Sequence, residues 1–406
     1  MSGFLLPAGF HSFQSPDIDS ISELNSEEVK LVVILCGLPA RGKSYISKKL
    51  TRYLNWIGSP CKVFNAGNTR RLNQNLASNS KFFDSTDATS KDLRDTIAME
   101  TLNELILWLS KPGHKVGIHD ATNTTIQRRK MLLEFISDYD LPVLFLESIC
   151  TDKEVLQQNM KMKLMSPDYI KMDPALAMLD FKQRMENYEK VYQTIGEQEE
   201  QENLSYVKVI NVGRKIVANN IQGFTPSQIV FYLLNIHINE RSIWLTRHGE
   251  SEYNVENRIG GDPNLTTYGK AYGKSLSNFI SKEYEDGKLL VWTSLMRRTF
   301  QTVQYLPDVF EIKTIKTLNE IYAGSCEHLT YDEIYKAYPD EIAARKKDKL
   351  RYRYINGESY LDVIERLRTV IIELERMQSD VLIVTHNAVM RTILSYFLGY
   401  LMTNID

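Results

Sequence analysis

Short apolar runs alternate with stretches in which apolar residues recur at helical spacing, starting at about residue 30. Lys30–Cys36 and Val143–Ile149 are almost continuously apolar, which is typical of strands that helices cover on both faces. The alternation also predicts strands at Lys62–Asn65, Lys115–His119 and Tyr206–Val212, and helices at Lys43–Trp56, 90–109, Ile126–Ser137, 153–165 and Pro226–Asn235. Strands that alternate with helices predict an α/β fold built on a parallel sheet.

A second alternating run begins after the polar stretch His237–Arg241. It predicts strands at Ser242–Leu245, Lys288–Thr293 and Asp380–Thr385, and helices near 266–283, 330–337 and 359–377. We therefore predict an α/β chain of two three-layer domains, at residues 29–240 and 241–406. Residues 1–28 show no period and are predicted to be a disordered tail, and the acidic stretch Glu197–Asn203 is predicted to be an exposed turn.

Composition narrows the class of protein. The 406 residues are 43% hydrophobic and 25% charged, as in a soluble globular protein, and the net charge of −2 argues against a general nucleic-acid binder. No apolar run is long enough for a membrane helix, and the N-terminus lacks the pattern of a secretion signal. Together with four unpatterned cysteines, this predicts a reducing, cytoplasmic location.

A phosphate-binding motif follows the first predicted strand. The segment Gly37–Ser44 reads GLPARGKS, a complete GxxxxGK[ST] pattern between a strand and a helix. Backbone N–H groups of such a loop point at phosphate oxygens, the lysine bridges the outer phosphates and the serine hydroxyl binds Mg²⁺. The motif predicts an ATP site formed by Gly37, Ala40, Arg41, Gly42, Lys43, Ser44 and Tyr45.

Asp120 ends a predicted strand near this loop and starts the segment DATNTT. A carboxylate there suits Mg²⁺ coordination or orientation of an acceptor hydroxyl, although an aspartate at this place can also be a helix cap. An anionic acceptor would need cations around it. The candidates are Arg70, Arg71, Arg94, Arg184 and Tyr188. Taken singly, each arginine is better explained as a solvated or ion-paired surface residue.

The second candidate centre follows the strand Ser242–Leu245. Arg247 and His248 belong to the segment TRHGES, and His386 follows the strand Asp380–Thr385. A neutral imidazole can attack phosphorus while arginines neutralise the phosphoryl oxygens, which gives Arg247 and Arg298 a role, and Glu320 could protonate the leaving oxygen. The alternative is that these histidines are hydrogen-bonded core residues.

The segment 345–354 is basic with interleaved tyrosines. In isolation it reads as a solvated face or a weak nucleic-acid contact. After a phosphohydrolase centre, it could instead hold the far phosphate of a bisphosphorylated substrate.

The motifs together resemble the bifunctional 6-phosphofructo-2-kinase/fructose-2,6-bisphosphatase family. The resemblance extends from about residue 30 to 398 and rests on GLPARGKS, FNAGNTRR, DATNTT, SPDY, LTRHGES, RIGGD, AGSCE, GESY and THNAVMR in this order. It implies a P-loop kinase domain that makes fructose 2,6-bisphosphate from fructose 6-phosphate and MgATP. It also implies a histidine phosphatase domain, similar to phosphoglycerate mutases, that removes the 2-phosphate through a phosphohistidine and so controls glycolytic flux.

The resemblance assigns roles to individual residues. In the kinase, Lys43, Ser44, Asp120 and Lys163 match nucleotide and catalytic positions, with Ser44 and Asp120 on Mg²⁺. The sugar-phosphate positions match Arg70, Arg71, Arg94, Thr122, Arg184 and Tyr188. In the phosphatase, the matching positions are Arg247, His248, Asn254, Arg298, Glu320 and His386, and the stretch that contacts the 6-phosphate includes Arg351, Tyr352 and Arg353. No nucleic acid or membrane partner is implied, and a homodimer is one assembly that the resemblance would allow.

Four departures from the family pattern stand out. Ile126 replaces an arginine after DATNTT, so one contact to the acceptor is expected to be absent. Asn356 replaces a basic residue before GESY, and Asn387 replaces a glutamine after His386. The chain ends at Asp406, where family members usually continue through another strand.

These departures leave a second hypothesis open, in which one or both activities are weak and the protein regulates by binding nucleotide and sugar phosphate. A third hypothesis, a polynucleotide end-processing kinase–phosphatase, is disfavoured by the near-neutral charge and the Arg-His-Gly chemistry. Turnover of fructose 6-phosphate with ATP separates the first two, and binding to oligonucleotide ends would support the third.

Overall fold

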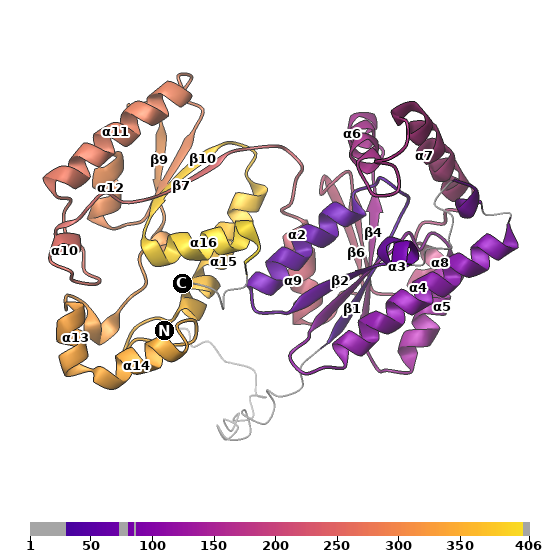
Figure 1. The fold of residues 1–406 in the computed structure, drawn as a ribbon, viewed down its shortest axis with the longest axis horizontal. Helices are drawn as coiled ribbons and strands as arrows, with labels where there is room; N and C mark the ends of the chain where they lie inside the picture. The colour runs from indigo at the N-terminus through magenta and orange to yellow at the C-terminus, as the bar shows by residue number, and fades with distance from the viewer. Residues whose placement is uncertain (1–29, 73–79, 85–86, 401–406) are drawn as a thin grey trace, which may run out of the picture.

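The computed structural model describes residues 30–72, 80–84 and 87–400, so the predicted disordered tail lies outside the described residues. Its strands form two separate sheets, one of six strands and one of four. Figure 1 shows the two sheets in two lobes, with α2 (Lys43–Trp56), α9 (Phe224–Leu233), α15 (Tyr360–Arg376) and α16 (Asn387–Leu398) at the junction. In the part of the chain that the structure describes, no helix is long and apolar enough to cross a membrane.

The first sheet has the order β2-β3-β1-β4-β5-β6. Its strands are β1 (Leu31–Cys36), β2 (Cys61–Asn65), β3 (Val116–Asp120), β4 (Val143–Ile149), β5 (Tyr206–Ile210) and β6 (Lys215–Asn219). The first five are mutually parallel, whereas β6 runs antiparallel to β5 and was not predicted. Because β1 lies between β3 and β4, the chain changes direction across the sheet at β1, which is where ligands bind in open α/β sheets.

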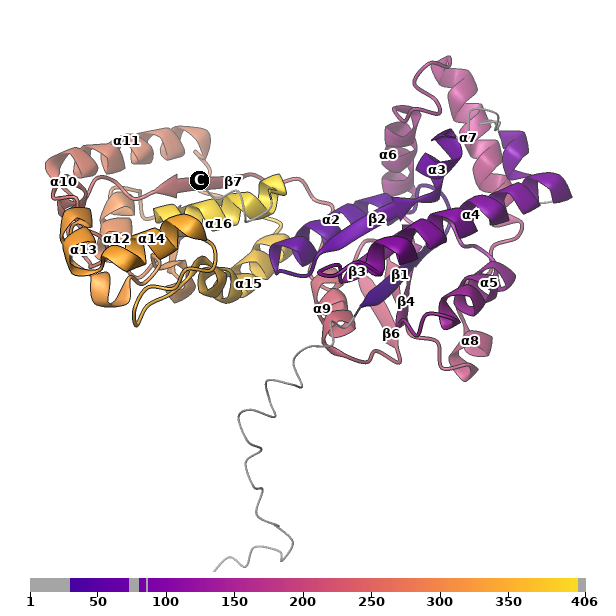
Figure 2. The ribbon, with the colours of Figure 1, turned by 60° about the horizontal axis from the view of Figure 1, so that its bottom comes forward.

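Helices cover both faces of this sheet, as Figure 2 shows from a second direction. The side chains of β1 alternate between two buried clusters: Val33 packs with α2 and α9, and Val32 packs with α4 (Ala88–Leu109) and α5 (Ile126–Ser137). All six residues of β1 are buried, as its continuous apolar run requires. This gives the predicted three layers.

The described residues of the first half contain four further α-helices. They are α3 (Ala66–Leu72), α6 (Lys153–Leu164), α7 (Pro174–Glu189) and the short α8 (Glu197–Gln201). The stretch Glu197–Asn203 is mostly exposed, as predicted, but it begins with a short helix instead of a turn, and Glu199 is only 4% exposed. Its carboxylate binds both the Nε and a terminal nitrogen of the fully buried Arg129, at 2.6 and 2.7 Å.

The second sheet is fully parallel and has the order β7-β10-β8-β9. Its strands are β7 (Ile243–Arg247), β8 (Leu290–Thr293), β9 (Glu311–Thr314) and β10 (Val381–Thr385). One face packs on α11 (Thr267–Glu283) and α12 (Arg297–Val303), and the other packs on α15 and α16. Beyond these lie α10 (Glu252–Val255), α13 (Tyr331–Ala337) and α14 (Pro339–Lys347).

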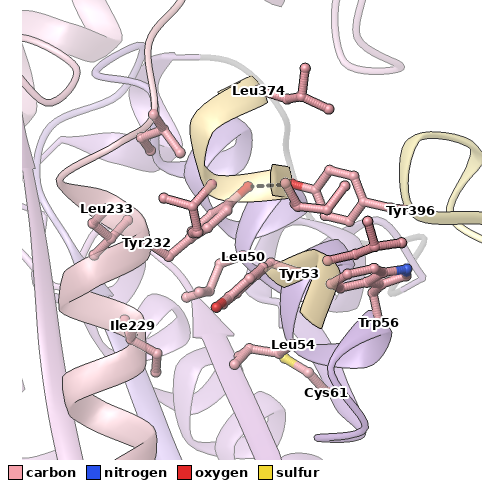
Figure 3. Close-up of a cluster of buried hydrophobic side chains, with 14 of the residues drawn as sticks. Leu50, Tyr53, Leu54, Trp56, Cys61, Ile229, Tyr232, Leu233, Leu374 and Tyr396 are labelled. Carbon is pink, nitrogen blue, oxygen red and sulfur yellow. Dashed lines mark hydrogen bonds between the residues drawn. The ribbon is translucent and has the colours of Figure 1, made fainter. Parts of the chain in front are cut away.

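Residues of both lobes share one buried cluster at the junction (Figure 3). The ring of Tyr53 on α2 stacks on Tyr232 of α9, and the hydroxyl of Tyr232 lies 3.1 Å from that of Tyr396 on α16. Trp56 of α2 donates from its indole nitrogen to the backbone oxygen of Thr392 at 3.1 Å. The two lobes are thus joined by a packed core as well as by the connecting chain.

A buried charge lies in the same junction. Glu375 of α15 is 0% exposed, and its carboxylate contacts Lys49 at 2.5 Å and Arg52 at 2.7 Å, both on α2. The Tyr396 hydroxyl donates to the same carboxylate at 2.6 Å. Burial acts to raise the pKa of Glu375, but the two cations and the hydroxyl outweigh it and lower the pKa.

Candidate active sites

The loop between β1 and α2 adopts the backbone conformations that a phosphate cradle needs. Gly37, Ala40 and Gly42 have positive φ values of 122°, 59° and 93°. A Cβ on Gly37 would lie 2.5 Å from the backbone oxygen of Ser148, so only glycine fits there. The loop therefore presents its backbone to the space in front of α2, as the motif predicts.

Lys43 is buried at the first position of α2. Its ammonium donates to the backbone oxygens of Gly37 and Leu38, both at 2.7 Å. Burial lowers the pKa of Lys43 to about 8, and the charge of Asp120 opposes that shift. This cation therefore lacks a full counter-charge in the free protein and would gain from binding a phosphate anion.

A cavity of about 900 Å³ extends from this loop to the arginine-rich region, and we call it the P-loop site. The following residues, all predicted from the sequence as site residues, line this cavity: Ala40, Gly42, Lys43, Ser44, Tyr45, Arg70, Arg71, Arg94, Asp120, Thr122, Lys163, Arg184 and Tyr188. Gly37 and Arg41, which were also predicted, are not in the lining. The guanidinium of Arg41 instead donates to the backbone oxygen of Cys150 at 2.7 Å and pairs with Glu189 at 2.9 Å.

Two oxygen donors for a divalent cation lie together at the loop. The hydroxyl of Ser44 is 3.4 Å from Oδ2 of Asp120, which also accepts a hydrogen bond from Asn65 at 2.6 Å. Mg²⁺ is usually held by one or two protein oxygens together with substrate phosphates. The pair therefore fits a magnesium ion that arrives with a nucleotide.

An acidic residue organises the arginines at the far end of the cavity. Asp168 contacts Arg70 at 2.5 Å, Arg71 at 3.3 Å and Arg184 at 3.7 Å. Burial acts to raise the pKa of Asp168, but the arginines outweigh it and lower the pKa. Three cations around one carboxylate leave positive charge for an anionic ligand, a feature that individual arginines in the sequence could not reveal.

Ile126 is not in the lining of the P-loop site, whereas Thr125, Gln127 and Arg128 are. Arg128 also forms an ion pair with Asp95. Sequence reasoning did not name Arg128, which lines the cavity two residues after Ile126. The first turn of α5 directs positions 127 and 128 to the cavity, and a helical projection from the cap Thr125 could have suggested it.

The second centre, which we call the histidine site, lies at the carboxyl ends of adjacent parallel strands. His248 follows β7 and His386 follows β10, and the register pairs Arg247 with Thr385. The backbone nitrogen of His248 donates to the Thr385 oxygen at 3.0 Å. The centroids of the two imidazole rings are consequently only 5.1 Å apart.

The hydrogen bonds of His248 define its reactive nitrogen. Nδ1 lies 2.7 Å from the backbone oxygen of Gly249, an acceptor, so the proton is on Nδ1. Nε2 accepts a hydrogen bond from Nε of Arg298 at 3.1 Å. Burial, reinforced by Arg298 and Arg247, lowers the pKa of His248 to about 3. The imidazole is therefore neutral at pH 7, with its lone pair on Nε2 directed at an arginine.

Glu320 and His386 meet at the start of α16. The carboxylate of Glu320 accepts hydrogen bonds from the backbone nitrogens of Asn387 at 3.0 Å and Ala388 at 3.2 Å. Burial raises the pKa of Glu320 despite these bonds, which is the direction a general acid needs. Burial and the nearby Arg298 lower the pKa of His386 well below its usual value.

Other predicted residues of the histidine site differ in placement. Arg247 is the exposed last residue of β7, and the side chain of Asn254 accepts two hydrogen bonds from Ser251 in a helix cap. The three residues predicted to contact the 6-phosphate each have a local acidic partner: Tyr352 with Glu341, Arg351 with Asp348, and Arg353 with Asp362.

Two further arginines lie close to Tyr360 of α15. Tyr360 interacts with Arg391 and is close enough to Arg345 and Glu320 for their charges to affect its pKa, which burial raises. In the sequence, Arg391 appeared only within the segment THNAVMR and Arg345 only within the basic run 345–354. Their approach to Tyr360 depends on how α14, α15 and α16 pack, which no local pattern shows.

Two departures from the family pattern have structural explanations. Asn356 has a φ of 57°, a left-handed conformation that asparagine tolerates better than most residues. Asn387 meets Glu320 through its backbone nitrogen, so that contact is independent of its side-chain length. Neither substitution removes a group that holds the two histidines and Glu320 together.

Comparison with known families matches both halves of the chain. The sequence model of the 6-phosphofructo-2-kinase family matches residues 19–240, and that of the histidine phosphatase superfamily (branch 1) matches residues 243–406. The chain is similar to 6-phosphofructo-2-kinase 1 of Saccharomyces cerevisiae, with 48% identity covering 93% of this chain and 49% of that protein.

Two rat proteins named as bifunctional are similar to the same degree. 6-phosphofructo-2-kinase/fructose-2,6-bisphosphatase 1 of Rattus norvegicus is 48% identical over 90% of this chain and 77% of its own length. The rat protein 6-phosphofructo-2-kinase/fructose-2,6-bisphosphatase 3 is 47% identical over 90% of this chain and 66% of its own length. The chain thus spans about half of the yeast relative and about two thirds of the second rat relative.

Proposed function

The chain belongs to the 6-phosphofructo-2-kinase/fructose-2,6-bisphosphatase family, and on that premise we propose that it both makes and hydrolyses fructose 2,6-bisphosphate. Residues 29–240 would transfer phosphate from ATP to fructose 6-phosphate, and residues 241–406 would remove the 2-phosphate. Both substrates are cytoplasmic metabolites in this proposal, so we place the protein in the cytoplasm. The observation that supports it best is the presence of both the P-loop site and the histidine site on one chain.

In the kinase reaction, the protein positions the nucleotide and the acceptor sugar, and it neutralises the charge of their phosphates. The loop backbone and Lys43 bind the nucleotide phosphates. Ser44 and Asp120 would hold a Mg²⁺ ion, which would shield phosphate charge. Arginines at the other end of the cavity bind the 6-phosphate of the acceptor sugar, which brings its 2-hydroxyl toward Asp120 and Lys163. Asp120 then orients that hydroxyl.

In the phosphatase reaction, Nε2 of His248 attacks phosphorus of the 2-phosphate, and the bond to the sugar oxygen breaks. Glu320, with its raised pKa, gives its proton to that oxygen. Arg298 and Arg247 neutralise the phosphoryl oxygens during transfer. Water then attacks the phosphohistidine, Glu320 takes up a proton again, and inorganic phosphate leaves.

One preparation of the whole chain tests both halves of the proposal. Fructose 6-phosphate and ATP should yield fructose 2,6-bisphosphate, and the bisphosphate labelled at position 2 should yield labelled inorganic phosphate. Tight binding of both substrates without turnover would favour the regulatory hypothesis over the catalytic one.

The pKa of Lys43 predicts a proton linkage in nucleotide binding. Because phosphates favour the charged ammonium, ATP should raise this pKa above its free value of about 8. Near pH 8.5 the free protein has largely lost this proton, so ATP binding should take up a fraction of a proton, and the uptake should fade toward pH 6.5. Calorimetry in two buffers of different ionisation enthalpy measures it. Equal uptake by Lys43→Met would contradict the assignment.

Arg128 offers a test of the acceptor end of the cavity. Arg128→Gln should raise KM for fructose 6-phosphate roughly tenfold or more, because a charge-assisted hydrogen bond contributes about 1.5–3 kcal/mol. KM for ATP should change little. Ile126→Arg is the matched control: its position outside the lining predicts an unchanged sugar-phosphate KM, whereas a fall in that KM would restore the sequence-based interpretation of Ile126.

A further inference from the structure

Two adjacent strands of the second sheet end in residues that meet at one place. The first residue after β8 is Ser294, and the first after β10 is His386. The register pairs Val384 with Thr293, so the strands deliver these two side chains to neighbouring positions. Both residues are 0% exposed, and Oγ of Ser294 lies 2.8 Å from Nε2 of His386.

The other ring nitrogen of His386 has no protein partner. Among the described residues, none forms a hydrogen bond with Nδ1, although this atom is buried. A buried polar atom without a partner is costly unless a ligand or water supplies one. The imidazole of His386 faces His248 and is influenced by Arg298 and Arg247, which are the groups that surround the reacting phosphoryl group in the proposed mechanism.

The hydroxyl protons around Ser294 can be counted. Its Oγ accepts from the backbone nitrogen of Met296 at 3.1 Å and lies 2.9 Å from Oγ1 of Thr299. The Thr299 hydroxyl donates to the backbone oxygen of Met296 at 2.8 Å, so the single Ser294 proton goes either to Thr299 Oγ1 or to Nε2 of His386. If it goes to His386, the imidazole proton must be on Nδ1. In the opposite arrangement, a bare Nδ1 lone pair would face the oxygens of a phosphoryl anion, which is repulsive.

We propose that Ser294 is a positioning residue for the phosphatase: its hydroxyl donates to Nε2 of His386 and keeps the proton on Nδ1, where it donates to an oxygen of the transferring phosphoryl group. The inference rests on the proposed phosphatase function for its catalytic meaning. The hydrogen bond between Ser294 and His386 is made by neutral groups only. It therefore orients the imidazole without adding a charge beside the phosphoryl anion.

The tautomer itself can be observed without any turnover. Long-range ¹H–¹⁵N spectra of the full chain labelled at histidine, with the His386 signals assigned by their loss in His386→Gln, should show the Nδ1–H form. Ser294→Ala should convert His386 to the Nε2–H form or to a mixture. A wild-type protein in the Nε2–H form, or a tautomer that is unaffected by Ser294→Ala, would overturn the proposal even if the phosphatase is active.

Kinetics on the same variants supply the second readout. Ser294→Ala should lower kcat of the phosphatase roughly ten- to a hundredfold. Losses of this size are typical when the hydrogen-bond partner that fixes the tautomer of a metal-ligating histidine is removed. KM should change much less. The melting temperature of each variant reports whether it is folded, and Ser294→Cys, which keeps the volume and a weak donor, should recover part of the loss.

A buried serine elsewhere in the same half provides the matched control. Ser277 of α11 is 7% exposed and donates to the backbone oxygen of Tyr305 at 2.6 Å. Ser277→Ala should leave both kcat and the tautomer of His386 unchanged. Equal losses of kcat in Ser277→Ala and Ser294→Ala would mean that Ser294 has only a general structural role.

Discussion

Lys43→Met is expected to abolish ATP-dependent formation of fructose 2,6-bisphosphate while phosphatase turnover continues. The ammonium is buried in the loop that receives the nucleotide phosphates, so methionine removes a fixed positive charge where negative charge moves during transfer. We expect kcat of the kinase to fall roughly a thousandfold or more. The fold should tolerate the change, because methionine has a similar length and the buried charge itself opposes folding.

The measurement is both activities on one preparation, with the melting temperature of each variant. Lys62→Met serves as control, because Lys62 is an exposed lysine of the same half that does not line the cavity. Loss of both activities in a Lys43→Met protein that still melts as the wild type does would contradict the assignment of the two reactions to two separate centres.

His248→Ala is expected to remove the phosphatase and the covalent intermediate together. Substrate labelled at the 2-phosphate should leave acid-labile label on the wild-type protein in rapid-quench experiments, and no label on His248→Ala. Because His248 is the nucleophile that takes the phosphoryl group from the sugar in the proposed mechanism, turnover should fall by roughly a thousandfold or more. Kinase turnover should persist, so the variant should accumulate fructose 2,6-bisphosphate.

Two further variants identify the labelled residue and the second histidine. His328→Ala should still acquire label, because that exposed side chain contacts Tyr253 rather than the paired imidazoles. His386→Ala should slow turnover and change the amount of label at steady state. A wild-type enzyme that hydrolyses substrate at full rate without ever carrying label would mean that water attacks phosphorus directly.

Much of the fold could be predicted because its strongest local signals agree. α2 and α5 have the predicted bounds, since a glycine of the phosphate loop precedes one and Thr125 caps the other. β6 was missed because it is a short edge strand without a continuous buried face, so neither periodicity nor apolar content marks it. α8 was misread because its acidic composition conceals the one carboxylate, Glu199, that a distant arginine neutralises.

Some residues of the candidate sites could be predicted from the sequence and others could not. Residues in a motif, such as Lys43 and His248, could be named because their chemistry depends on local spacing. Asp168 and Ser294 could not, because their roles follow from neighbours that are about 100 residues away in the chain. Arg351 and Arg353 were named from a basic run, but in the structure each forms an ion pair with a nearby aspartate.

The buried ion cluster of Glu375 with Lys49 and Arg52 has a consequence for how a cell could use this protein. Separation of the lobes would leave a carboxylate without its cations and expose the aromatic side chains of Trp56 and Tyr396 to water. The two centres to which we assign opposing reactions are therefore made and degraded as one folded polypeptide, in equal copy number. A change in the amount of this protein changes both proposed activities in the same ratio. The ratio of synthesis to hydrolysis would therefore depend on factors that alter the turnover rate at one centre relative to the other.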